Sequence, residues 1–166
     1  MTTSIIKDYP YPLAVACNAV ETETKHPFIR LHRCLDALET LVRYCAGITL
    51  CSLNTQQLDA KMRKKLLINM ECPSLGKWAG LLRDTLPIAD LNRVPELEIF
   101  YKKSLESRLE GKRNLIRLRN QVAHGGFIDD ARAKDLLAQA EPPIRQLFED
   151  AAFLADTPLV AVCGTQ

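Results

Sequence analysis

The residues best suited to chemistry lie in residues 118–126, which contain Arg119, Asn120 and His124 followed by two glycines. Histidine titrates near neutral pH and can accept or donate a proton. Arginine is a permanent cation that binds two phosphate oxygens at once. RNA carries its own nucleophile, so a metal-independent ribonuclease needs only a base, an acid and a cation. The pattern predicts this chemistry, with Asn120 orienting His124 or donating to the phosphate.

A long amphipathic helix is expected to position these side chains. The pattern predicts a helix from about Pro95 to Ala123, ended by Gly125 and Gly126 in the left-handed conformation of a helix C-cap. His124 then sits in the last turn, where the helix dipole favours the imidazolium form. The steps of three and four residues form two stripes: a polar one of Arg113, Arg117, Asn120 and His124, and an apolar one of Leu115, Leu118 and Val122.

The two central residues do not share a helix face. At roughly 100° per residue, Arg119 and His124 lie about 140° apart around the axis. Two copies of the helix, packed antiparallel about a two-fold axis, would bring both pairs into one cleft. The sequence therefore predicts a homodimer if these residues form an active site.

This arrangement resembles the motif of the HEPN family of helical nucleases, in which an Arg and a following polar residue precede a His by a few positions. Here Arg119, Asn120 and His124 match the motif, with a glycine after the histidine. The layout also resembles that family, with a long early helix, a late motif helix and a further helix after it. Residues 73–78 look like segments of bacterial members.

The resemblance implies a metal-independent endoribonuclease without a cofactor, which leaves 2′,3′-cyclic phosphate and 5′-hydroxyl ends. The catalytic residues would be Arg119, Asn120 and His124, in a cleft shared by two protomers, and the suggested role is in defence or stress response. Some HEPN-like domains do not cleave RNA and serve as dimerisation or regulatory modules of larger proteins. That alternative stays open, because Arg, Asn and His at a helix end also cap carbonyls and bind acidic neighbours.

Basic residues concentrate on the motif segment, although the formal net charge of the 166 residues is only +2. Residues 102–119 contain seven basic residues against Glu106 and Glu110, and residues 61–65 form a second basic cluster. This distribution suits a polyanion such as RNA, with Lys112, Arg113 and Arg117 contacting its backbone. A solvated helix face is the alternative explanation.

Other classes of protein find little support. The six cysteines form no C-x-x-C pair and no cluster with histidine at zinc spacing, which is typical of small buried residues in a reducing cytosol. The sequence contains no HExxH motif, glycine-rich phosphate loop, secretory signal or apolar run of membrane-spanning length. We expect a soluble cytoplasmic protein that acts without a metal ion.

The predicted fold is an all-α bundle with two long antiparallel helices and several shorter ones. The clearest helix begins at Pro27 and runs to about Leu53. Its apolar stripe consists of Phe28, Leu31, Leu35, Leu38, Val42 and Cys45. Shorter helices are expected after Pro12, after an N-cap at Asn54 and after an N-cap at Ser74. The last helix follows Asp129 or Asp130, and Pro142-Pro143 is expected to kink or divide it.

The domain is expected to occupy residues 1–157. Residues 158–166 include an apolar, partly β-branched run that reads as a strand. This tail is either the start of a further domain of a longer protein or a segment lying on the bundle.

Overall fold

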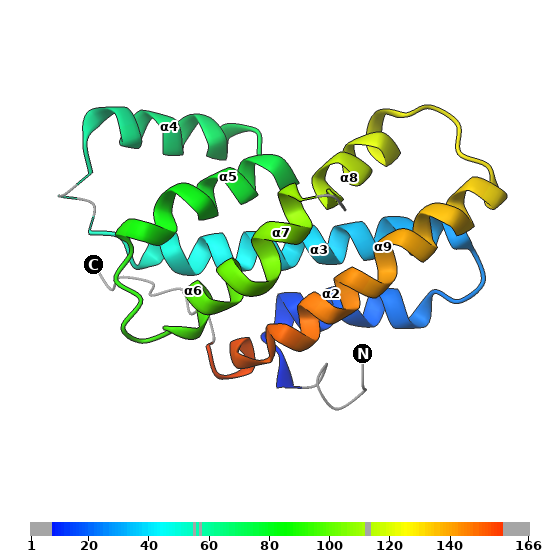
Figure 1. Cartoon of the computed structure of the whole chain (residues 1–166), viewed down its shortest axis with the longest axis horizontal. Helices are drawn as coiled ribbons and strands as arrows, with labels where there is room; N and C mark the ends of the chain where they lie inside the picture. Colours follow the sequence, from blue (N-terminus) through cyan, green and yellow to red (C-terminus); the bar gives the residue numbers. More distant parts are fainter. Residues whose placement is uncertain (1–7, 55, 57, 112–113, 158–166) are drawn as a thin grey trace, which may run out of the picture.

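The computed structural model describes residues 8–54, 56, 58–111 and 114–157 (Figure 1). This part of the chain is helical and contains no β-strand, which confirms the predicted all-α bundle. One isolated antiparallel bridge joins Leu53 and Ala89. The predicted strand in residues 158–166 lies outside the described residues. Each described helix is too short or too polar to cross a membrane.

The helices follow one another along the chain with short links. They are α2 (Tyr11–Thr22), α3 (Pro27–Cys51), α4 (Ala60–Glu71), α5 (Leu75–Thr85), α6 (Glu96–Phe100), α7 (Glu106–Glu110), α8 (Leu115–His124) and α9 (Asp130–Asp150). Two 3₁₀ turns, η2 (Leu86–Ile88) and η4 (Ala152–Asp156), follow α5 and α9. A π-helical turn, η3 (Tyr101–Leu105), joins α6 to α7 without a break.

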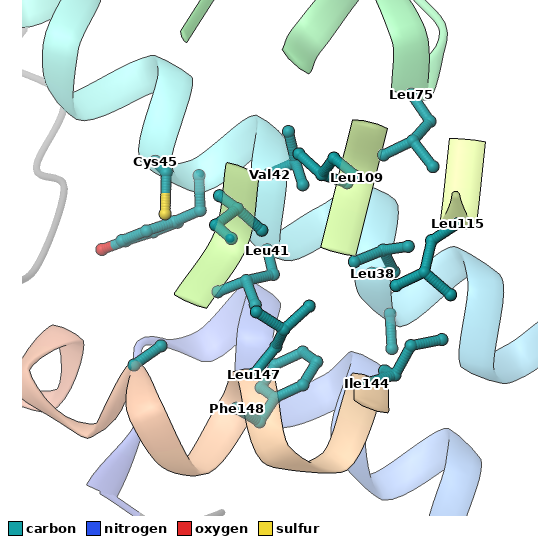
Figure 2. Close-up of a cluster of buried hydrophobic side chains, with 14 of the residues drawn as sticks. Leu38, Leu41, Val42, Cys45, Leu75, Leu109, Leu115, Ile144, Leu147 and Phe148 are labelled. Atoms are coloured by element: carbon teal, nitrogen blue, oxygen red, sulfur yellow. The ribbon is translucent and has the colours of Figure 1, made fainter. Parts of the chain in front are cut away.

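The core is built around α3, which packs against α2, α5 and α9. Its predicted apolar stripe is buried except for Phe28, which is 39% exposed at the start of the helix. Figure 2 shows side chains of α3 meeting Ile144, Leu147 and Phe148 of α9. Because those three side chains are at most 1% exposed, their burial is a main source of stability.

Figure 1 shows the segment α6–α8 running opposite to α3, but α3 has its main contacts with α2, α5 and α9, so the predicted pair of two long antiparallel helices is not formed. The segment α6–α8 is also not the single helix predicted for residues 95–123. Helix α7 ends at Glu110 and α8 begins at Leu115. A Cβ atom at position 111 would lie 2.1 Å from the Ser107 carbonyl oxygen. The turn after α7 therefore requires a glycine, which has no Cβ atom.

The side chain of Asn114 then starts the new helix. Its Oδ1 accepts a hydrogen bond from the Arg117 amide at 2.7 Å, which satisfies one of the free donors of the first turn. The orientation of α8 is therefore set by its own cap and packing, not by continuation of α7.

Two predicted caps are confirmed and one is wrong. Ser74 caps α5 and Asp129 caps α9. Helix α4 begins at Ala60, because Asp59 Oδ1 accepts from the Met62 amide at 2.6 Å, and not at the expected cap Asn54. The capping-box pattern at Asn54 is local, and the structure starts the helix five residues later.

The pair Pro142-Pro143 does not divide the last helix, which is assigned as one element from Asp130 to Asp150. Each proline removes a backbone hydrogen bond from the helix interior. Pro143 and Ile144 are buried, and α9 packs along α3. That packing offsets the lost hydrogen bonds.

A network of charged side chains ties α2, α3 and α9 together. Arg30 binds both carboxylate oxygens of Glu141, with N–O distances of 2.7 and 3.0 Å. Arg145 binds Glu141 Oε1 at 2.7 Å and also Glu21 Oε1 at 2.7 Å. The bidentate hydrogen bond from Arg30 is the main cause that lowers the pKa of Glu141 to about 2, well below its ordinary 4.5.

This network predicts a loss of stability in acid. Because the pKa of Glu141 is lower in the folded state than in the unfolded state, its contribution is complete above about pH 4.5 and is lost as the pH falls toward 2. We expect Glu141→Gln to remove that part of the pH dependence of the free energy of unfolding. Urea titrations from pH 2 to 7 measure this. The control Asp135→Asn removes an exposed carboxylate from the same helix and should leave the dependence unchanged.

Candidate functional site

Two glycines, Gly125 and Gly126, end α8, and each is required for a different structural reason. A side chain on Gly125 would bring its Cβ within 2.1 Å of the Gln121 carbonyl oxygen. Gly126 has a φ of +78°, in the left-handed region that glycine adopts without strain. The predicted stop is therefore confirmed, with Gly126 as the residue in the left-handed conformation. His124 occupies the last position of the helix and is exposed.

The side chains of α8 divide into a buried side and an exposed side. Leu115 and Val122 are buried and face the core. At 100° per residue, Arg117, Gln121 and His124 fall within about 60° of one another on a second side. All three of these polar residues are exposed. Asn120 is exposed as well and lies one turn before His124.

Arg119 lies about 40° from Leu115 around the axis, beside the buried side of α8, and reaches α3. Its Nη2 lies 3.2 Å from Oε2 of Glu39, and the two side chains are 27% and 24% exposed. The expected angle of about 140° between Arg119 and His124 means that one chain does not aim both at a common point. The structure thus places Asn120 and His124 as neighbours and holds Arg119 in an ion pair.

A groove of about 670 Å³ lies between α8 and α9. Its residues from α8 and the link before it include Asn114, Arg117 and Gln121, and α9 contributes Arg132 and Gln139. Apolar side chains complete the lining, namely Leu115, Leu118, Leu136, Ala138, Pro142 and Pro143. The described lining residues include two arginines and no Asp or Glu, so the groove has a positive potential suited to an anionic ligand.

The α9 side of this groove was missed by the sequence prediction. Arg132, Leu136, Gln139 and Pro143 recur at steps of four, three and four residues, so they share one face of α9. The prediction considered only the apolar stripe of this helix. Of the predicted RNA-binding residues, Arg117 lines the groove. Lys112 and Arg113 lie outside the described residues.

Another histidine, His32, belongs to α3. It is half-buried on α3, and its ring meets the edge of Phe28 at a centroid distance of 4.5 Å. Its Nε2 atom is buried and has no hydrogen-bond partner among the described residues. His32 lies two helical turns before Glu39, which binds Arg119.

The cysteines are only partly the buried residues expected. Cys17, Cys34 and Cys45 are buried, and burial raises the pKa of each thiol to about 12, which keeps it protonated and unreactive. Cys51 and Cys72 are exposed. The part of the chain that the structure describes contains no group of three or more His, Cys, Asp or Glu placed to hold a metal ion.

Comparison with known proteins finds no match, whether among family models, curated proteins or solved structures. The resemblance to HEPN nucleases therefore rests on Arg119, Asn120 and His124 with the glycine that follows, on residues 73–78 and on the order of the helices.

Proposed function

We propose that the chain binds RNA in the groove between α8 and α9 and cleaves it without a metal ion, as a homodimer. The observation that carries this proposal is the groove itself. It is lined by Arg117 and Arg132 and has no carboxylate among its described lining residues. His124 does not line the groove, but it lies on the same side of α8 as Arg117 and Gln121, which do. Its three amide side chains can hydrogen-bond to base edges, and its apolar residues can pack against bases.

His124 would act as the acid–base residue. One histidine removes the proton of the 2′-hydroxyl of the RNA. The 2′-oxygen then attacks phosphorus to form the O2′–P bond. The P–O5′ bond then breaks, and a second histidine protonates the leaving 5′-oxygen. A homodimer supplies both histidines. The products are a 2′,3′-cyclic phosphate and a 5′-hydroxyl, and no external oxidant or metal is needed.

The cation for this step comes from one of two places. Arg117 lies on the His124 side of the same helix and belongs to the groove. Arg119 uses one of its five N–H donors for Glu39, so the others remain for a phosphate oxygen of RNA bound across a dimer interface. Asn120, next to His124, would orient the imidazole or donate to the phosphate.

The test is incubation of the purified chain with a mixed single-stranded RNA pool in excess EDTA. The proposal expects cleavage that persists in EDTA and leaves cyclic phosphate ends, together with a dimer in sedimentation experiments. A folded dimer that binds RNA without cleaving it would support the second function below. A chain without affinity for RNA would refute the proposal.

The groove also predicts which basic residue matters for binding. Arg117→Ala should weaken binding of single-stranded RNA by about tenfold and lower the slope of log affinity against log salt by about 0.7, the value for one phosphate contact. Lys134→Ala, which removes an exposed cation of α9 that does not line the groove, should change affinity by less than about threefold. Fluorescence anisotropy at several salt concentrations measures both. A larger effect at Lys134 would place the RNA elsewhere.

A second function is favoured by the ion pair between Arg119 and Glu39. A non-catalytic module for dimerisation or regulation within a larger protein would keep this arginine in a structural role. In that case Arg119→Ala would lower stability, by up to about 1 kcal/mol for a pair this exposed, and would leave no cleavage activity to lose. The EDTA assay separates the two functions.

A further inference from the structure

Helix α4 is attached to the rest of the molecule by few contacts. It packs on α5, and Leu66 is its one buried residue. An ion pair of 2.6 Å between Lys65 and Asp84 adds to this attachment. Figure 1 shows α4 on the outside of the bundle, beyond α5. The remaining apolar side chains of α4 are therefore available for another contact.

Those side chains line a groove of about 460 Å³ between α4, the end of α3 and the link that joins them. Its apolar residues are Leu50, Leu58, Leu66, Leu67 and Met70. Leu67 is 65% exposed and Met70 is 49% exposed, values that are costly for large apolar side chains in water. Adjacent apolar residues exposed beside a groove are typical of an interaction site.

The charge around this groove is positive. Helix α4 carries four basic residues and one acidic residue, Glu71. Arg63 is the basic residue that lines the groove, and Lys64 lies about 100° from it around the helix axis. Lys61 and Lys65 lie on the opposite side of α4, where Lys65 pairs with Asp84.

Arg63 is positioned in the groove by a 3.0 Å hydrogen bond from its Nε to the Leu58 carbonyl. The described residues that line the groove include no Asp or Glu.

We propose that this groove binds an acidic amphipathic helix of a partner protein. A groove beside a helix, with an apolar floor, suits the apolar face of a second helix. Arg63 in the groove and Lys64 beside it complement glutamates or aspartates that flank such a face. The proposal uses none of the residues assigned to RNA, so either one can fail without the other.

The test compares two helical peptides of roughly 16 residues, long enough to span about 24 Å. Both carry leucine at helical spacing, and one has glutamate and the other lysine at the flanking positions. Leu67→Asp should weaken binding of the acidic peptide by about tenfold or more. The matched control is Ile68→Asp, because Ile68 is the next residue, is 49% exposed and does not line the groove. Circular dichroism checks that both variants fold.

The expected result is binding of the acidic peptide alone, sensitive to Leu67 and not to Ile68. Binding of neither peptide, or of both equally, would overturn the proposal. Self-association that Leu67→Asp abolishes would assign the groove to a second copy of the chain and overturn it too. The proposal would also be overturned if the chain bound phosphatidylserine vesicles in a way that depends on Leu67 and did not bind the acidic peptide.

Discussion

Replacing His124 with alanine should reduce the rate of RNA cleavage by about 100-fold or more, the usual contribution of a positioned acid or base. The side chain is exposed at the end of α8, so its removal should leave folding nearly unchanged, within about 0.5 kcal/mol. RNA affinity should also persist, because Arg117 and Arg132 of the groove remain. The measurement is single-turnover cleavage at saturating protein, with affinity determined separately by anisotropy.

His26→Ala is the matched control for this variant. His26 is likewise exposed but precedes the first turn of α3, on a different element. The proposal expects full activity in the control. Equal cleavage by wild type and His124→Ala would mean that the activity belongs to a contaminant or to another site, and the role of His124 would be refuted. Loss of activity in both variants would mean that the loss is not specific to His124, and the assay would then not support its role as acid or base.

Phe148→Ala should lower the free energy of unfolding by about 3–5 kcal/mol, the usual cost of truncating a buried phenylalanine. Phe148 is 0% exposed at the centre of the contact between α9 and α3 (Figure 2). The ring of Tyr9 packs on it edge-on at 6.0 Å, and the Tyr9 hydroxyl donates to the Phe148 carbonyl. The truncation would leave a cavity that several elements border.

Urea denaturation measures this change, with Phe127→Ala as control. Phe127 is 94% exposed, so its removal should change the free energy of unfolding by no more than about 0.5 kcal/mol. A loss below about 1 kcal/mol at Phe148 would contradict the assigned core. A total stability of 5–15 kcal/mol is ordinary for a single domain, so Phe148→Ala would remove a large part of it.

The helices could be predicted where local chemistry agrees with packing. The stripe from Leu31 to Cys45 repeats at helical spacing, and the core fills that face. Ser74 and Asp129 are caps whose side chains act within three residues. These are short-range signals, and tertiary contacts do not compete with them.

The break at Gly111 carried a signal that the prediction overlooked. From Leu105 to Leu109 the apolar step is four residues, but the next apolar position is Leu115, six residues on. A continuous helix would have turned a basic pair toward the core at that point. The prediction weighed the polar pattern of the whole segment and gave too little weight to the missing apolar position.

The candidate site could be predicted only in part, because half of its groove comes from a distant element. Arg117 and His124 are close in sequence, and their common side follows from helical geometry. Arg132 and Gln139 line the same groove as Arg117 only because α9 packs beside α8. The ion-pair partner of Arg119 could not be predicted either, because Glu39 lies 80 residues away in the sequence. Local patterns contain no information about such contacts.

The π-helical turn at Tyr101–Leu105 has a consequence for the winding of this segment. Leu97, Tyr101, Leu105 and Leu109 are all buried, although each follows the last by four residues. In a regular α-helix three such steps would carry the stripe about 120° around the axis and turn Leu109 away from the core. A π turn winds more residues into each revolution, so it cancels much of this drift. One residue fewer in this turn would therefore rephase Glu106–Glu110 by about 100° and expose Leu109.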